Sequence, residues 1–271
     1  MPKVQANGIE MAYEISGQGH PLLLIAGVGY GAWFWHSIAP ALAEHYRVIT
    51  FDNRGAGDSD KPDGPYTVPM MAADTAGLLD TLQIKGAYVL GHSLGGFIAQ
   101  ELAITRPDLV SKLILASTNH GGMNVIPITP EALKVLTDRS GELIELVKRG
   151  LAVAAAPGIM GRYPYLMEKL IHYRLTNPVP PVQYTAQVMA GATMATLTEA
   201  QVAGRMAAIK APTLLLSGEF DMVVPPGNVE LMADKLPNAK IKILPNTGHI
   251  FPLEDPEVAV KAIVEFVDTA S

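Results

Sequence analysis

Short runs of apolar residues alternate with longer helix-like segments over the first 120 positions of the chain. The apolar runs cover residues 21–27, 46–52, 87–93 and 111–118. They lack the strict alternation of a strand with one solvated face, and are typical of parallel strands buried on both faces. The helix-like segments between them cover residues 32–45, 70–84 and 95–107. This order predicts a parallel sheet covered by helices.

The two ends of the sheet follow different patterns. Two short alternating runs flank Asn7-Gly8, and Asn-Gly is a strong signal for a two-residue hairpin, so we expect an antiparallel edge first. Between residues 121 and 205 the strand signals vanish, and helical segments broken by proline and glycine take their place. Strand-like runs resume at 212–221 and 239–249, before an amphipathic segment at 255–270. We therefore predict a core of residues 1–120 and 206–271 and a helical cap of residues 121–205.

Composition narrows the function classes. The chain has 271 residues, of which 49% are hydrophobic and 17% charged, as expected of a globular protein with a sizeable core. A net charge of −6 offers no electrostatic footprint for nucleic acid. The absence of cysteine excludes disulfides, thiolate metal sites and a cysteine nucleophile. Without a visible signal peptide or an apolar run long enough for a membrane span, a cytoplasmic protein with no membrane partner is expected.

One predicted turn carries a candidate catalytic serine. The stretch VLGHSLGGF, residues 89–97, places Ser93 between Gly91 and Gly95, after a predicted strand and before a predicted helix. This is the G-x-S-x-G nucleophile elbow, in which glycines let a strained turn close and lift the serine hydroxyl clear of the backbone. The following helix directs its free N–H groups toward the place where an oxyanion would develop. The alternative is a tight turn with an incidental serine.

A serine hydroxyl is a weak nucleophile and needs a base that a third group orients. Asp221 and His249 each follow a late predicted strand, and the chain order Ser, Asp, His matches the nucleophile elbow. Glu219 is a rival acid two residues from Asp221. Among the seven histidines the main competitor of His249 is His120, which ends a predicted strand beside the cap.

Stabilisation of the oxyanion requires two N–H donors. The glycine-rich segment LLLIAGVGYGAWFW follows an early strand, and we expect the N–H of Val28 to join that of Leu94. The glycines of this segment could also serve only as a tight turn into a helix.

The chain resembles the α/β-hydrolase superfamily at four motifs in the right order. They are DNRGAGDSD at 52–60, GHSLGG at 91–96, SGEFDMVVP at 217–225 and NTGHIFPLEDP at 246–256. The resemblance implies an α/β-hydrolase fold: a mostly parallel eight-stranded sheet with helices on both faces and a helical cap insertion. It implies Ser93 as nucleophile, His249 as general base and acid, and Asp221 as the orienting acid.

The resemblance also has one departure. Many relatives begin the oxyanion segment with His-Gly, whereas this chain has Ala26-Gly27, so the hydrogen bonds from that histidine are missing. Asp52 and Arg54 are implied to be structural. The similarity is greatest to the smaller esterases, enol-lactonases and carbon–carbon bond hydrolases. A serine at position 93 argues against the branches that use an aspartate nucleophile.

These features predict a serine hydrolase that cleaves a small, mostly apolar ester or lactone without a metal or an organic cofactor. A carbon–carbon bond hydrolase or a cofactor-free perhydrolase would use the same triad. Candidate substrate-binding residues are Trp33 and His120. Five methionines could line the pocket or simply fill the core: Met123, Met160, Met167, Met189 and Met194.

Two other function classes compete. Gly27, Gly29 and Ala32 fit a dinucleotide-binding fingerprint, with Asp52 at the spacing of its ribose-binding acid. That interpretation leaves the elbow, the late acid and the late histidine unexplained. A non-catalytic binder would be signalled by a missing triad residue, and none is missing. Homo-oligomerisation stays open.

Overall fold

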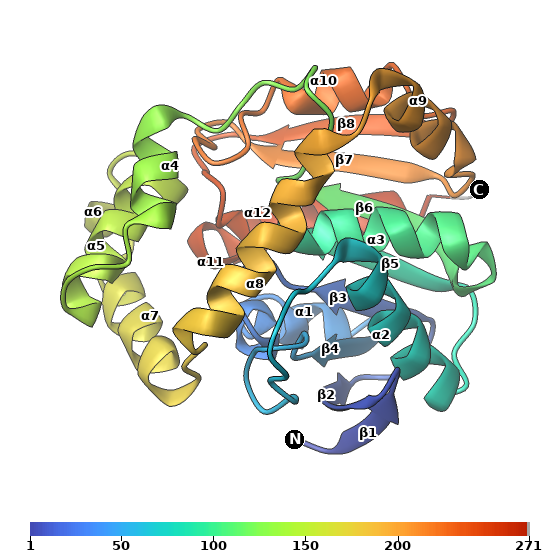
Figure 1. Cartoon of the computed structure of the whole chain (residues 1–271), viewed down its shortest axis with the longest axis horizontal. Coiled ribbons are helices and arrows are strands. Elements are labelled where there is room, and N and C mark those ends of the chain that lie inside the picture. Colours follow the sequence, from blue (N-terminus) through green and yellow to red (C-terminus); the bar gives the residue numbers. More distant parts are fainter. Residues whose placement is uncertain (270–271) are drawn as a thin grey trace.

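The computed structural model describes residues 1–269 and has an eight-stranded sheet at its centre (Figure 1). Its strands are β1 (Lys3–Ala6), β2 (Ile9–Ser16), β3 (Pro21–Ile25), β4 (Arg47–Phe51), β5 (Ala87–His92), β6 (Val110–Ala116), β7 (Thr213–Gly218) and β8 (Ala239–Leu244). They lie in the order β1-β2-β4-β3-β5-β6-β7-β8. The pairs β1–β2 and β2–β4 are antiparallel and the others parallel. The predicted mostly parallel eight-stranded sheet is confirmed.

The antiparallel edge begins with the hairpin that the sequence predicts. Only Asn7 and Gly8 separate β1 from β2, and their φ angles are 48° and 79°. A two-residue turn that matches the twist of its strands needs positive φ at both positions, which asparagine and glycine tolerate best.

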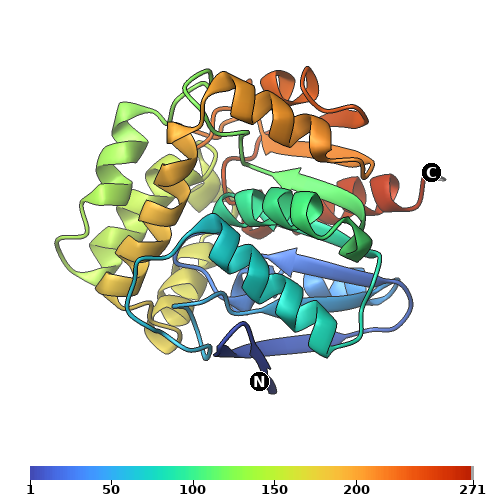
Figure 2. The same cartoon turned by 45° about the vertical axis from the view of Figure 1, so that its right-hand side comes forward.

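Helices cover both faces of the sheet. One face carries α2 (Val68–Thr81), α3 (Leu94–Thr105) and α10 (Asn228–Ala233), and the other carries α1 (Ala39–Ala43), α11 (Phe251–Glu254) and α12 (Pro256–Val267). Figure 2 shows α2 and α3 side by side across the near face. Alternate side chains of β3 pack into the hydrophobic cores on opposite faces of the sheet. Leu23 and Ile25 pack on the face covered by α2 and α3, whereas Leu22 and Leu24 pack on the face covered by α1 and α12.

One predicted helix has a different form. Residues 32–45 form a 3-10 turn, Ala32–Trp35, followed by the short α1. Pro40 is one of the first residues of α1, where its missing N–H removes no intrahelical hydrogen bond. The 3-10 turn therefore ends at Trp35, and a separate α-helix begins at Ala39, next to the proline.

Between β6 and β7 the described chain forms helices and no strand, as predicted. These are α4 (Pro130–Thr137), α5 (Leu143–Ala154), α6 (Ile159–Arg162), α7 (Tyr165–Thr176), α8 (Pro181–Ala192) and α9 (Glu199–Ala208). Figure 1 shows α4 to α7 beside the sheet and α8 crossing in front of it. The boundary expected at residue 205 falls inside α9, and Arg205 of this helix pairs with Glu101 of α3 at 2.7 Å. We therefore place α9 against the core.

The strand register sets the position of the functional loops. Ile25 of β3 is opposite Gly91 of β5, and Gly218 of β7 is opposite Leu244 of β8. The loops after β3, β5, β7 and β8 consequently leave the same carboxyl edge of the sheet, where open α/β sheets bind ligands. In residues 1–269, no helix combines the length and apolarity that crossing a bilayer requires.

Candidate active site

Ser93 lies at the turn between β5 and α3, with φ 55° and ψ −119°. A positive φ is rare for a residue with a side chain, so the turn holds Ser93 under strain. The flanking glycines explain how the turn closes. A Cβ on Gly91 would lie 2.2 Å from the Gly95 carbonyl oxygen, and a Cβ on Gly95 would lie 2.2 Å from the carbonyl oxygen of Ile25. The geometry is that of the elbow expected from the sequence.

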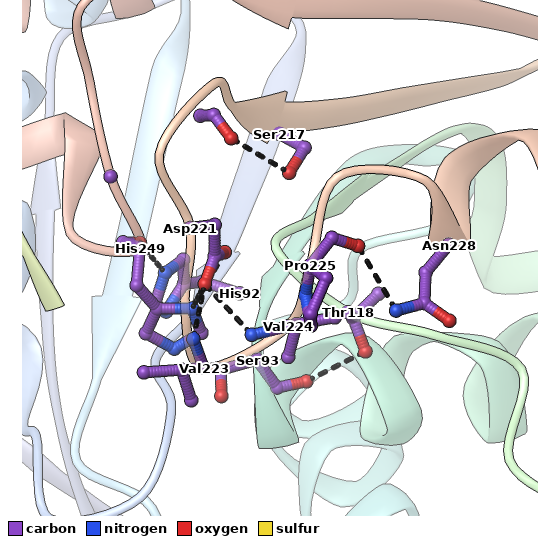
Figure 3. A network of polar contacts seen from close by, with 12 residues as sticks. His92, Ser93, Thr118, Ser217, Asp221, Val223, Val224, Pro225, Asn228 and His249 are labelled. Carbon is purple, nitrogen blue, oxygen red and sulfur yellow. Dashed lines mark hydrogen bonds and ion pairs between the residues drawn. The ribbon is translucent and has the colours of Figure 1, made fainter. Parts of the chain in front are cut away.

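Asp221 and His249 form a buried pair at the ends of the last two strands (Figure 3). Nδ1 of His249 lies 2.9 Å from Oδ2 and 3.1 Å from Oδ1 of Asp221. The carboxylate is only 3% exposed, and it also accepts hydrogen bonds from the N–H groups of Val223 (2.9 Å) and Val224 (2.8 Å). These donors offset the cost of burying the carboxylate and fix its orientation.

The pair fixes the tautomer of His249. A hydrogen bond to a carboxylate requires a proton on Nδ1, which leaves Nε2 of a neutral imidazole as a free acceptor. His249 and Ser93 border the same cavity. The arrangement can therefore take a proton from a group in that cavity while Asp221 stabilises the resulting imidazolium.

The rival acid, Glu219, faces elsewhere. Its side chain is exposed, and Oε2 accepts a hydrogen bond of 2.9 Å from the N–H of Asn246. Glu219 thus bridges the loops after β7 and β8 from the outside, whereas Asp221 is the acid that contacts His249.

The two expected oxyanion donors belong to different segments: Leu94 follows Ser93 in the elbow, and Val28 lies in the loop after β3. Val28 and Leu94 both line it, and neither N–H group donates a hydrogen bond to another residue of the described chain. A Cβ on Gly27 would lie 3.0 Å from the Ser93 Cβ, which shows how closely the loop passes the serine. Two free N–H groups beside a hydroxyl can stabilise a tetrahedral oxyanion.

Residues 26–31, which we name the oxyanion loop, are held by side chains that sequence reasoning did not identify. Gln187 of α8 is fully buried, and it accepts a hydrogen bond of 2.9 Å from the N–H of Gly29. Its Nε2 donates to the carbonyl of Arg54 at 2.9 Å. Asn53 donates to the carbonyl of Ala26 at 3.0 Å. These contacts hold the backbone on both sides of Val28.

Gln187→Ala is expected to lower kcat for ester hydrolysis by tenfold to about a hundredfold, with a much smaller change in KM. The mutation leaves the Gly29 N–H buried without an acceptor and frees the adjoining Val28, and losing one oxyanion donor entirely costs about 10²–10³ in kcat. Gln183 lies one turn earlier in α8 and is also buried, and its Nε2 donates a hydrogen bond to the carbonyl of Lys61. Gln183→Ala is therefore the matched control. Steady-state kinetics and melting temperatures of both variants provide the measurement. Equal losses of kcat in the two would contradict a specific role for Gln187.

Glu254 of α11 holds the segment that carries His249. Its buried carboxylate accepts hydrogen bonds from the N–H groups of Gly248 (2.9 Å) and Ala156 (2.7 Å). It thereby connects the residue before His249 to the loop that follows α5. Burial raises the pKa of Glu254 to about 7. The negative charge of Asp221 raises it further, while the two N–H donors and Arg162 oppose the shift.

The raised pKa of Glu254 predicts a pH-dependent stability. A carboxyl group whose pKa is higher in the folded than in the unfolded state stabilises the fold below the unfolded value of 4.5, and this contribution is lost as pH rises through about 7. Relative to Glu254→Gln, the free energy of unfolding of the parent protein should fall by up to about 3 kcal/mol between pH 4.5 and pH 8. Urea unfolding at both pH values tests this. The exposed neighbour Glu257, changed to glutamine, should leave the parent profile intact.

His92 supports His249 from behind. Its Nε2 donates to the His249 carbonyl at 2.7 Å, and the two ring centroids are 4.8 Å apart. Burial lowers the pKa of His92 well below its ordinary value, and the nearby His249 lowers it further, so the ring is neutral near pH 7. The ring of His92 thus braces the backbone of the predicted base.

The cavity that joins these groups has a volume of about 370 Å³ and mostly apolar walls. Neither suggested substrate-binding residue lies on its wall. Trp33 is 3% exposed and stacks on Tyr173 of α7 at 4.8 Å, so it packs the 3-10 turn against that helix. His120 is fully buried, and its Nδ1 contacts the carbonyl of Gly121 at 2.6 Å. None of the five methionines suggested for the pocket borders this cavity.

The dinucleotide fingerprint has a structural explanation. Asp52 is 3% exposed, and its carboxylate accepts hydrogen bonds from the N–H groups of Ala32 and Asp58, both at 2.8 Å. It therefore ties together two loops and is not free to bind a ribose. Arg54 pairs with the buried Asp74 at 2.6 Å, which fits the structural role implied for it. In the part of the chain described, no three histidine or acidic side chains cluster as metal ligands would.

Comparisons with known proteins agree with this architecture. A Mycobacterium tuberculosis protein with a provisional non-heme bromoperoxidase name is 33% identical, over 95% of this chain and 97% of its own. A thermophilic esterase from Thermogutta terrifontis superposes with a TM-score of 0.83 at 28% identity, covering 98% of each chain. The enol-lactonase from Burkholderia xenovorans LB400 superposes with a TM-score of 0.80 at 26% sequence identity, and the match covers 99% of this chain and 100% of the enol-lactonase chain. The model of the alpha/beta hydrolase family matches residues 22–262, and the chain belongs to that family.

Proposed function

We propose that this hydrolase cleaves a small, mostly apolar carboxylic ester or lactone through an acyl-serine intermediate on Ser93. The observation that carries the proposal is the buried Asp221–His249 pair, 2.9 Å apart, whose histidine borders the same cavity as the strained Ser93. The names of an esterase and an enol-lactonase among its structural relatives support the same class of reaction.

The residues act in two half-reactions. Ser93 Oγ attacks the substrate carbonyl carbon as its proton passes to Nε2 of His249, and the N–H groups of Val28 and Leu94 stabilise the oxyanion. The C–O bond to the alcohol then breaks, and His249 returns the proton to the departing oxygen. A water molecule that His249 deprotonates attacks the acyl-serine, and collapse of the second tetrahedral intermediate releases the acid and restores Ser93.

The cavity walls support a small, apolar substrate. Aliphatic side chains from the cap form much of the lining, among them Leu143, Leu146, Val147, Leu151 and Leu170. Burying apolar substrate carbons against these side chains supplies binding energy, while the polar groups at the carboxyl edge of the sheet orient the scissile carbonyl.

The proposal is tested by reacting the protein with a fluorophosphonate and with a panel of 4-nitrophenyl esters, lactones and vinylogous diketones. Peptide mass spectrometry should find one phosphonyl group, on Ser93, and the esters or lactones should turn over. Heat-unfolded protein should not react, because the folded site activates the hydroxyl. Turnover confined to the diketones would replace ester cleavage with carbon–carbon bond hydrolysis. Absence of both labelling and turnover would refute the proposal.

A further inference from the structure

Two arginines border the mostly apolar cavity, and none of its lining residues in the described chain is acidic. Arg139 follows α4 and Arg174 belongs to α7, so both come from the helical insertion. Neither forms an ion pair in the described chain, where the arginine ion pairs belong to Arg54, Arg106 and Arg205. Arg139 is exposed and Arg174 half-buried, so the cavity is bordered by two positive charges, neither of which is paired with a carboxylate of the described chain.

Aromatic rings hold both guanidinium groups in place. The Cζ atom of Arg174 lies 4.4 Å from the ring centroid of Tyr30, and its Nη1 donates to the carbonyl of Gly29 in the oxyanion loop. The Cζ atom of Arg139 lies 4.5 Å from the ring centroid of Tyr184. Tyr184 is itself packed beside Gly29, since a Cβ there would lie 2.9 Å from its ring. The two cations therefore flank one tyrosine on the cap side of the cavity.

We propose that Arg139 and Arg174 bind a carboxylate carried by the substrate, remote from the ester or lactone group that reacts at Ser93. This inference rests on the proposed function and names a substrate class: half-esters of dicarboxylic acids, or esters and lactones of similar shape that carry one acid group. The aliphatic walls of the cavity would contact the chain between the two polar ends.

The chemistry of the arginines favours a carboxylate. A neutral substrate that covered both guanidinium groups would remove their water without replacing its hydrogen bonds, which is unfavourable. A carboxylate replaces them, because its two oxygens match the N–H groups of a guanidinium fork. Stacking on Tyr30 and Tyr184 limits the freedom of both side chains before the ligand arrives, and so reduces the entropy lost on binding.

The test compares substrates that differ only in the remote charge. Mono-4-nitrophenyl adipate is paired with 4-nitrophenyl 6-methylheptanoate, in which an isopropyl group replaces the carboxylate. A second pair, 6-acetoxyhexanoate and 6-methylheptyl acetate, places the charge on the alcohol side. In at least one pair, kcat/KM of the parent protein should favour the carboxylate by about tenfold or more, the factor that one charge-assisted contact provides.

Arg139→Gln should reduce that ratio by about tenfold. Arg174 is unsuitable for this test because it also holds Gly29. The control is Arg106→Gln, which makes the same charge change far from the cavity at an exposed ion pair and should leave the ratio unaltered. A preference that survives in Arg139→Gln would overturn the assignment. If the isopropyl esters turn over as fast as the acids in both pairs, this inference fails while the proposed function stands. The proposed function itself fails if none of the four reacts and Ser93 stays unlabelled.

Discussion

His249→Ala is expected to lower kcat for 4-nitrophenyl ester hydrolysis by about 10⁵–10⁶-fold, the largest effect we predict. Without the imidazole no group removes the proton of Ser93 as it attacks, and loss of the base alone in such a triad costs about as much as loss of the whole triad. Residual turnover should come from the oxyanion donors and from substrate binding. Pre-steady-state release of nitrophenolate with substrate in excess would measure both the burst of acylation and the slower steady-state rate.

His120→Gln is the informative control for this variant. His120 follows β6 and is the other histidine that the sequence suggested as a base, yet its ring is buried and contacts Gly121 instead of Ser93. We expect kcat to change less than about tenfold, because no catalytic contact is lost. Comparable turnover of His249→Ala and the parent protein would contradict the assignment of the base.

The sequence was sufficient for residues that follow strand ends. Ser93, Asp221 and His249 each follow a strand that the sequence predicts, namely β5, β7 and β8, within five residues of its carboxyl end. In a parallel sheet such ends meet at one edge, so the sequence predicts that the three residues lie at the same edge of the sheet. The same reasoning predicted the loop that carries Val28.

The positions of strand ends do not predict where side chains point or which distant residues they contact. Gln187 contacts Gly29 across 158 positions, and its role depends on how α8 crosses the sheet, which no local pattern encodes. Trp33 follows the oxyanion loop in the sequence, yet its ring packs away from the cavity. Glu254 lies in a motif that was recognised, but its two backbone contacts appear only in the folded structure. Helix orientation and rotamer choice therefore account for most of what was missed.

Asp221→Asn should lower kcat by about 10⁴-fold while leaving the fold intact. The neutral amide keeps the shape of the side chain, but it no longer stabilises the imidazolium, and its NH₂ group favours the wrong tautomer of His249. Oδ1 of Asp221 also accepts hydrogen bonds from the N–H groups of Val223 and Val224. The amide oxygen of the asparagine can accept the same two hydrogen bonds if it takes the position of Oδ1. Its NH₂ group then faces Nδ1 of His249, where the carboxylate of the parent protein accepts a hydrogen bond.

Glu219→Gln discriminates between the two acids. This exposed residue accepts one hydrogen bond, from the N–H of Asn246, and the glutamine oxygen can accept it as well, so we expect kcat within about threefold of the parent value. The decisive measurement is the steady-state kcat of both variants, because loss of the acid that orients His249 slows the chemical steps, whereas a loosened surface loop does not. A 10⁴-fold loss in Glu219→Gln with an active Asp221→Asn would move the orienting role to Glu219. The buried 2.9 Å contact between Asp221 and His249 argues for the opposite result.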